Sequence, residues 1–412
     1  RHTRSLCDWS SDVCSSDLGA NQREIGQAIR YLGYGLDVIA DAMDDGPIDF
    51  NYIDVTLALW YSGHAIDSRQ LAGLLWNEGI AQGGIGQAIR YLGYGPDVIA
   101  DAMADGPINF NSIDTAIALW NSGHAMNTRN IAGFLWNEGF SQGDIGQAIR
   151  YLAAIGKFDG LTAIADAMMD GPIDFNHLDT ALALWNSGYS LDTRRLAGLL
   201  WNEGVTQGNI GKAIKYLGYG LDVIADAMDD GPIDFNHIDV TLALWNSGYA
   251  LNTRQLAGLL WNEGINQSSI GQAIRYLGYG LDVIADAMAD GPIDFNSVDT
   301  AIALWNSGHA LNTRTIAGLL WNEGFNQGEI GQAIRYLASI GNFNGLVAIA
   351  DAMVDGPIDF NHLDTAVALW NSGYAIDGRN IAALLWNESI AQAQRSEEHT
   401  SELQSHSDLV CR

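Results

Sequence analysis

The sequence predicts an all-α fold, a tandem-repeat α-solenoid of six repeats with roughly four short helices in each. Three observations predict it: an octapeptide that recurs, apolar residues at helical spacing, and capping residues before the helices. The octapeptide IGQAIRYL, or its variant IGKAIKYL, begins at six places: Ile25, Ile85, Ile145, Ile210, Ile270 and Ile330. A repeat of this length cannot bury its apolar faces alone, so the repeats are expected to stack.

The repeats are about 60–65 residues long and form a triplet that is written twice. The third and sixth repeats are longer, because YLGYGLDVIADAM becomes YLAAIGKFDGLTAIADAM or YLASIGNFNGLVAIADAM there. The predicted boundaries are 25–84, 85–144, 145–209, 210–269, 270–329 and 330–394. This organisation is similar to that of α-helical solenoid repeat proteins in general.

The first helix of a repeat is predicted over residues 267–277, where Ile270, Ala273 and Ile274 share one apolar face. Asn266 is its expected N-cap. Its counterparts in the other repeats are Asn21, Ala81, Ser141, Thr206 and Asn326. The second helix is predicted over 221–228, and Gly231 and Pro232 are expected to end it.

The third helix is predicted to begin near Asp234 and to end at Gly248, and the fourth to run from Asn252 to Gly264. The cap position of the fourth helix holds only Asp or Asn: Asp67, Asn127, Asp192, Asn252, Asn312 and Asp377. An N-cap accepts either residue, whereas a catalytic carboxylate would not. Both helices are apolar on more than one face, so they must be sandwiched between neighbours.

Composition limits the classes of function. The chain has 412 residues with 49 acidic and 20 basic side chains, a formal charge of −29, and 48% apolar residues. The apolar content is too high for a disordered acidic tail. The negative charge would repel nucleic-acid phosphates, and no apolar run reaches the roughly 20 residues that a membrane-spanning helix requires.

Both ends of the chain resemble translated sequencing-adapter DNA. The runs DWSSDVCSSDL (8–18) and RSEEHTSELQS (395–405) resemble translations of the two strands of one oligonucleotide. We therefore expect residues 1–19 and 395–412 to be disordered additions, and the natural protein to continue beyond both. All three cysteines lie in these ends, so cysteine usage assigns no compartment and the localisation is left unknown.

Two segments resemble ligand-binding motifs. Residues 226–236 resemble an EF-hand loop, with Asp226 and Asp230 at ligand positions, but Met228 and His237 replace the ligands at positions three and twelve. Residues 259–274 are similar to a helix-turn-helix, yet only Arg275 supplies a cation beside the second helix. We therefore expect no metal, no cofactor and no nucleic-acid partner.

Charged and aromatic side chains also recur in each repeat. Asp222, Asp226 and Asp229 or Asp230 form an acidic stripe on the second helix, which is expected to be a solvated outer face; the alternative is a ridge that attracts a basic partner. Arg254 and Arg275 are expected to pair with such acids across repeats. Twelve tryptophans, two in each repeat from Trp60 to Trp386, are expected to fill the core rather than to form a binding ladder.

No spacing typical of a catalytic site is found, so the sequence predicts a non-catalytic binding or scaffold protein for a protein or peptide partner. The variable polar positions are the candidate contact residues. They are Tyr52, Ser112, His177, His237, Ser297 and His362 at the start of the third helix, and His64, His124, Tyr189, Tyr249, His309 and Tyr374 beyond it. A surface structural array that binds calcium is the second hypothesis, and a tandem helix-turn-helix protein that binds nucleic acid is the third. The sequence does not indicate the oligomeric state.

Overall fold

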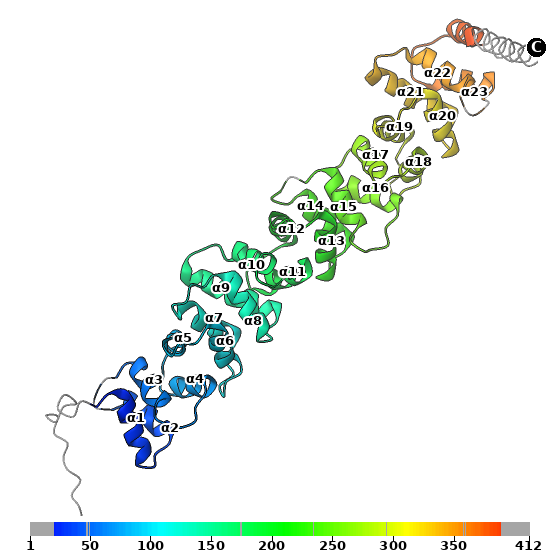
Figure 1. The fold of residues 1–412 in the computed structure, drawn as a ribbon. Helices are drawn as coiled ribbons and strands as arrows, with labels where there is room; N and C mark the ends of the chain where they lie inside the picture. Colours follow the sequence, from blue (N-terminus) through cyan, green and yellow to red (C-terminus); the bar gives the residue numbers. More distant parts are fainter. Residues whose placement is uncertain are drawn as a thin grey trace, which may run out of the picture. The chain divides into compact units, whose positions relative to one another are not determined.

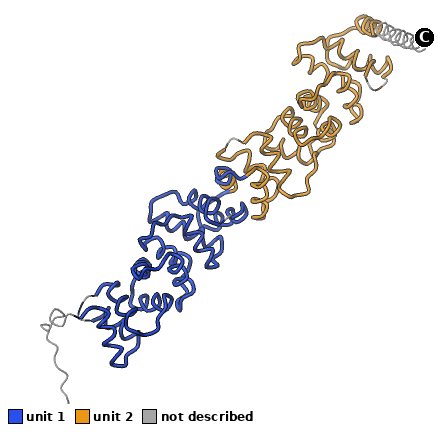
Figure 2. Tube along the Cα trace, in the orientation of Figure 1, with its two compact units in different colours: residues 1–192, 199–205 blue, residues 193–198, 206–412 orange. Residues whose placement is uncertain are grey.

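The computed structural model describes residues 20–388 except 47, 49, 174, 234, 294, 357 and 359. The predicted additions, 1–19 and 395–412, lie outside these residues. The chain divides into two compact units (Figure 2). The first comprises residues 1–192 with 199–205, and the second comprises 193–198 with 206–412.

The described residues are helical, with no strand among them (Figure 1). The first unit contains α1 (Gln22–Tyr31), α2 (Leu36–Asp44), α3 (Tyr52–Trp60), α4 (Ser68–Asn77), α5 (Gln82–Tyr91), α6 (Pro96–Ala104), α7 (Ser112–Asn121), α8 (Thr128–Asn137), α9 (Gln142–Gly156), α10 (Gly160–Met169) and α11 (His177–Asn186). The boundary between the units falls within α12 (Thr193–Asn202). The second unit contains α13 (Gln207–Tyr216), α14 (Leu221–Asp229), α15 (His237–Trp245), α16 (Thr253–Asn262), α17 (Gln267–Tyr276), α18 (Leu281–Ala289), α19 (Ser297–Asn306), α20 (Thr313–Asn322), α21 (Gln327–Gly341), α22 (Gly345–Val354) and α23 (His362–Asn371), and residues 378–388 are helical as well.

The tandem-repeat solenoid with four helices per repeat is confirmed. The predicted N-caps also hold, since the Asn266 side chain accepts the Ser269 N–H and the Asn252 side chain accepts the Gln255 N–H. Such bonds satisfy backbone donors that the first turn of a helix leaves unpaired. Ala81 and Thr206 occupy the same position without a side-chain hydrogen bond.

The predicted start of the third helix is wrong by two residues. The N-cap of α15 is Asn236, whose side chain accepts the N–H groups of Ile238 and Asp239. The Asp239 side chain accepts the Asn236 N–H in return, which completes a capping box. Asp234, the cap that the sequence suggested, lies outside the described residues. Asn236 is the cap because three backbone N–H groups, those of Asn236, Ile238 and Asp239, find an acceptor there.

The additional residues of the third and sixth repeats lengthen the first helix. α9 and α21 have 15 residues, whereas α5 and α17 have 10. The longer helices end at Lys157 and Asn342, which adopt the left-handed conformation at φ 57° and 54°. Such a residue at the end of a helix turns the chain sharply toward the next one.

In each compact unit the helices form two layers. The odd-numbered helices contact each other in succession, from α1 to α11 in the first unit and from α13 to α23 in the second. The even-numbered helices do the same, from α2 to α10 and from α14 to α22. Consecutive helices contact each other across the layers, so a sequence repeat consists of two helical hairpins stacked side by side. We name these sets the odd layer and the even layer.

Glycine allows the odd-numbered helices to approach closely. Gly271 of α17 faces the backbone of α19, and a Cβ there would clash with the carbonyl oxygen of Ala303. Gly86 of α5 has the same relation to Ala118 of α7. The surrounding core consists of fully buried Ile, Leu, Ala and Met side chains. The glycine of IGQAIRYL is thus required by packing.

The expectation that tryptophan fills the core is wrong in part. Trp136, Trp261 and Trp321 at the ends of the fourth helices are 36–37% exposed. Their rings pack edge-on against buried phenylalanines, as Trp261 does against Phe295 with centroids 5.0 Å apart. Each ring therefore covers the core from outside, with one edge left in solvent.

Candidate binding grooves

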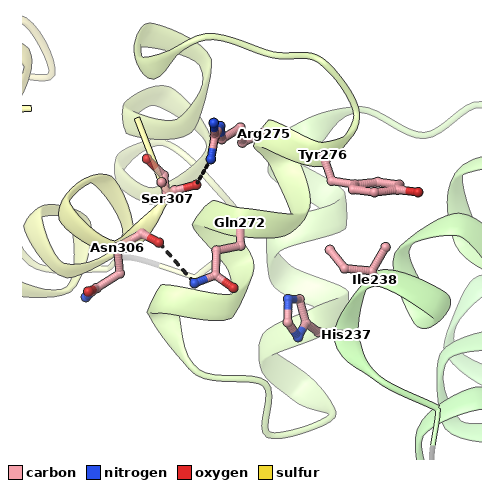
Figure 3. A pocket seen from close by; sticks show the side chains of 8 residues that line it. His237, Ile238, Gln272, Arg275, Tyr276, Asn306 and Ser307 are labelled. Atoms are coloured by element: carbon pink, nitrogen blue, oxygen red, sulfur yellow. Dashed lines mark hydrogen bonds between the residues drawn. The ribbon is translucent and has the colours of Figure 1, made fainter. Parts of the chain in front are cut away.

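A groove of about 490 Å³ lies on the odd layer of the second unit (Figure 3). Three successive odd-numbered helices supply its walls. His237 and Ile238 come from the start of α15, Gln272, Arg275 and Tyr276 from α17, and Asn306, Ser307 and Gly308 from the end of α19.

The same groove recurs at equivalent positions in both units. In the second unit, a groove of about 660 Å³ is lined by Val298, Gln332, Arg335, Tyr336, Ser339, Ser372, Gly373 and Tyr374. In the first unit, one of about 550 Å³ is lined by Tyr52, Ile53, Gln87, Arg90, Tyr91, Ser122 and Gly123. Another of about 410 Å³ is lined by Ile113, Gln147, Arg150, Tyr151, Ala154, Ser187 and Gly188. We call these four the odd-layer grooves.

The groove arginine is held by the turn that follows the next odd-numbered helix. Arg275 Nη1 donates to the Ser307 carbonyl at 3.2 Å, and Arg335 Nη1 donates to that of Ser372 at 3.3 Å. Gly308 has φ +89°, a conformation that favours glycine, and a Cβ there would occupy the place of the guanidinium. The NSG sequence therefore provides both the turn and the space for the arginine.

The groove glutamine has a similar anchor. Gln272 Nε2 donates to the Asn306 carbonyl at 3.0 Å, which satisfies an acceptor that the end of α19 leaves unpaired (Figure 3). Gln87 Nε2 donates to the Asn121 carbonyl at 2.8 Å in the same way. These bonds cross from one odd-numbered helix to the next, so the rigid stack of helices positions both polar side chains.

The tyrosine beside each groove arginine is exposed, and the sequence analysis missed it. Tyr91 is 61% and Tyr276 60% exposed, and Tyr151 and Tyr336 are each 43% exposed. These tyrosines are identical in all copies of the octapeptide, whereas the residues predicted to contact a partner vary between copies. The sequence feature that could have identified them is an aromatic residue that directly follows a basic one and lies outside the apolar face of the helix.

The candidate residues at the start of the third helix separate into three groups: two that line grooves, two histidines that line none of the four grooves, and two buried serines. Tyr52 and His237 line grooves, and the Tyr52 hydroxyl donates to Gln87 Oε1. Burial lowers the pKa of His237, against smaller opposing effects of Asp239 and Gln272, so the ring is neutral at pH 7. His177 is half-buried and His362 is exposed.

Ser112 and Ser297 are buried, so the prediction that they contact a partner is wrong. Ser112 Oγ donates to the Asp144 carbonyl at 3.1 Å, and Ser297 Oγ donates to the Glu329 carbonyl at 2.9 Å. The short side chain stays beneath the neighbouring helix, where a tyrosine or histidine would extend past it. These serines connect odd-numbered helices and offer no contact surface.

The second set of candidates connects neighbouring hairpins. His64 Nε2 lies 3.1 Å from the Tyr34 carbonyl, His124 Nε2 lies 3.2 Å from that of Tyr94, and the Tyr249 hydroxyl donates to that of Tyr219 at 2.7 Å. At these three positions histidine and tyrosine are interchangeable, because a ring nitrogen and a phenolic hydroxyl can each reach the equivalent backbone carbonyl.

The remaining members of this set also lie at junctions between hairpins. Tyr189 and Tyr374 lie under the guanidinium groups of Arg150 and Arg335, at 5.1 and 5.0 Å from the ring centres. The Nε2 atom of His309 is buried and has no hydrogen-bond partner among the described residues. Of this set, only Tyr374 lines an odd-layer groove.

The even layer carries a second recurring arrangement, in which arginine pairs with aspartate. As expected, Arg254 of α16 forms ion pairs with Asp286 and Asp290 of the following repeat. Equivalent pairs form at Arg69, Arg129, Arg194 and Arg314. The same expectation is wrong for Arg275, which lies on the odd layer and donates to a backbone carbonyl.

A glutamate joins most of these aspartate pairs. Three carboxylates converge within 4.8 Å in four groups: Asp101, Asp105 and Glu138; Asp166, Asp170 and Glu203; Asp286, Asp290 and Glu323; and Asp351, Asp355 and Glu388. Calcium takes six to eight oxygen ligands. Here the guanidinium group of an arginine already provides positive charge, and Arg194 occupies Asp226 and Asp230, the two EF-hand-like positions.

The arginine–aspartate pairs and the partly buried glutamates beside them predict that the protein is most stable at mildly acidic pH. Hydrogen bonds from arginine lower the pKa of Asp101, Asp226 and Asp286, so that contribution is lost as the pH falls below about 3.9, the value for an unfolded chain. Burial, with nearby aspartates, raises the pKa of Glu138 and Glu323, so their charged forms destabilise the fold at pH 7. The unfolding midpoint should rise as the pH falls from 7 towards about 4.3 and should then decrease.

Replacement by glutamine of the glutamates whose pKa is raised tests whether these particular groups, rather than the net charge of the chain, cause the pH dependence. The variant carries Gln at Glu138, Glu203, Glu263 and Glu323. It should be more stable than the wild type at pH 7 and should lose most of the rise on acidification. Its control carries Asn at three exposed aspartates, Asp37, Asp97 and Asp222, which do not contribute to the raised pKa values of these glutamates. Equal slopes of the thermal midpoint against pH in the two variants would contradict the prediction.

No family model matches this chain, and none of the curated proteins matches it either. The fold and the recurring grooves define it as a helical tandem-repeat protein. Among the described residues, no helix has the length and apolar character needed to span a membrane.

Proposed function

We propose that this protein is a non-catalytic binding or scaffold protein that presents the odd-layer grooves to a protein or peptide partner. The observation that supports the proposal is recurrence: an arginine, an exposed tyrosine and an anchored glutamine line an open groove at equivalent positions in several repeats. Repeat proteins bind extended partners along such series of equivalent surfaces.

The grooves have the composition of a protein-binding surface. Exposed tyrosine provides a large contact area and a hydroxyl group at little conformational cost, and arginine is enriched where proteins meet. Ile53, Ile113, Ile238 and Val298 add one apolar wall residue to each groove. A peptide in extended conformation could place side chains that are several residues apart in neighbouring grooves of the same unit.

The proposal predicts that peptide binding depends on the groove tyrosines. Serine at Tyr91, Tyr151, Tyr276 and Tyr336 should abolish the binding of peptides that the wild-type protein selects from an array covering acidic, neutral and basic compositions. The rings are exposed, so the helical content and unfolding midpoint should change little. The control is Val347→Ser, which alters an apolar residue, 44% exposed, on α22 of the even layer. Equal binding by the tyrosine variant, or selection of no peptide by the wild type, would refute the proposal.

The calcium-binding surface array is a second candidate, because carboxylates converge in four groups. It ranks below the first because arginine already pairs with two of the acids in each group. The nucleic-acid hypothesis ranks third, because Arg275 is the one cation beside the second helix of the helix-turn-helix-like segment and the chain has a formal charge of −29.

A further inference from the structure

We propose that the odd-layer grooves bind the carboxylate side chains of an extended acidic peptide, with Arg90, Arg150, Arg275 and Arg335 as the charge partners. This inference rests on the proposed function, since it assigns the partner's chemistry to the same grooves. It replaces the basic partner that the acidic composition suggested.

Charge is divided unequally between the two layers. The even-layer arginines, such as Arg254, each pair with two aspartates. Each odd-layer groove contains one arginine and no aspartate or glutamate. Among the described residues, these groove arginines form no ion pair with a carboxylate. In a chain with 49 acidic and 20 basic side chains, four grooves with this composition form distinct sites of positive charge.

Each groove arginine has donors left for a ligand. A guanidinium group carries five N–H donors in a planar fork that matches a carboxylate. Arg275 uses Nη1 for the Ser307 carbonyl, and Arg90 uses Nη1 for the Ser122 carbonyl at 3.4 Å. This bond holds the fork in place and reduces the side-chain entropy that binding would cost. Arg90 and Arg275 are both exposed.

The other groove residues suit a peptide side chain with one carboxylate. His237 is neutral at pH 7, because burial lowers its pKa, so the arginine supplies the positive charge of that groove. The exposed Tyr276 ring offers a wall for the aliphatic part of a glutamate. The amide of Gln272 is held by the Asn306 carbonyl and by a hydrogen bond with the His237 side chain, so it forms a fixed polar wall beside the arginine.

Neighbouring grooves favour an extended peptide over a free carboxylate. In the second unit, the groove at Arg275 and the groove at Arg335 share α19, which ends at one and begins at the other. A peptide that fills the first groove reaches the second at a high effective concentration. The overall negative charge repels an acidic peptide at long range, but physiological salt screens that repulsion beyond about 8 Å. The affinity for an acidic peptide is then determined by its short-range contacts with the guanidinium groups.

The test uses three fluorescein-labelled peptides of about 15 residues, which span roughly 50 Å when extended. The first alternates Glu with Ser, the second has Gln in place of Glu, and the third has Lys. Fluorescence anisotropy with the full chain near 150 mM salt should show binding of the Glu peptide at least about tenfold tighter than that of the Gln peptide. Preference for the Lys peptide, or equal binding of the Glu and Gln peptides, would overturn the inference.

Variants locate the binding. Glutamine at Arg90, Arg150, Arg275 and Arg335 should weaken binding of the Glu peptide about tenfold or more, and lysine at the same positions should restore part of it. Arg254→Gln removes a cation from the even layer and should leave binding unchanged. If the Glu peptide binds equally to wild type and the glutamine variant, the inference is wrong. Groove binding by neutral or basic peptides that requires the tyrosines would preserve the proposed function and reject only the acidic partner.

Discussion

Replacing Gly271 by alanine should destabilise the second unit by about 3 kcal/mol. In most helix interiors this change stabilises a protein by up to about 1 kcal/mol, because alanine has the higher helix propensity. At Gly271 the sign reverses, because the new Cβ would clash with the Ala303 carbonyl oxygen of α19. The obstacle is backbone, so α17 and α19 must separate. Urea unfolding followed by circular dichroism measures the loss.

Gly378→Ala is the matched control for Gly271. Gly378 lies in the helix over residues 378–388, and a Cβ there meets no atom within 4 Å. This variant should be as stable as the wild type or slightly more stable. Equal stability of Gly271→Ala and Gly378→Ala would show that close approach of the helices is not what requires glycine in the octapeptide.

Phe295→Ala should have the largest effect, a loss of about 3–5 kcal/mol. Phe295 is 4% exposed, and the Trp261 ring packs edge-on against it at 5.0 Å and 85°. Truncation leaves a cavity and removes the ring against which the partly exposed Trp261 packs. Because repeats interact mainly with their neighbours, hydrogen exchange should increase in α16–α18 and stay unchanged in α5–α7.

Phe295→Leu serves as the control for the cavity, because it keeps most of the buried volume and removes the ring contact. It should cost clearly less than alanine, and the tryptophan fluorescence of the chain should still change, because the ring contact with Trp261 is lost. Exchange that increases equally in both compact units of Phe295→Ala would mean that the chain unfolds as one cooperative block, contrary to the prediction.

The helices could be predicted from the sequence because the features that define them, capping residues and apolar spacing, are local. Asn252 and Asn266 cap helices where they were expected, and apolar spacing located the rest within a few residues. Asp234 and Asn236 are both good capping residues, so the start of the third helix could not be decided from residue type. The reciprocal hydrogen bonds of Asn236 and Asp239 decided it, and they depend on the folded turn.

The grooves were harder to predict because they depend on which helices share a layer. Arg254 and Arg275 look equivalent in the sequence, yet only Arg254 lies on the layer where aspartates of the next repeat come within reach. The burial of Ser112 and Ser297 likewise follows from the close packing of odd-numbered helices. Variation among copies pointed towards these serines, whereas the constant Tyr276 was the exposed residue.

The alternation of two hairpins has a consequence for folding fidelity. Within a set of four helices such as α17–α20, the two hairpins are joined on the odd layer by a hydrogen bond from glutamine to aspartate, as from Gln267 Nε2 to Asp299 at 2.7 Å. Between repeats, they are joined on the even layer by arginine and aspartate, as at Arg254 and Asp286. Nearly identical neighbours invite a chain to skip or shift its partners during folding. Since a hairpin of one kind carries the polar partners of the other kind, a shift by a single hairpin breaks these bonds, and only a shift by a whole repeat preserves them.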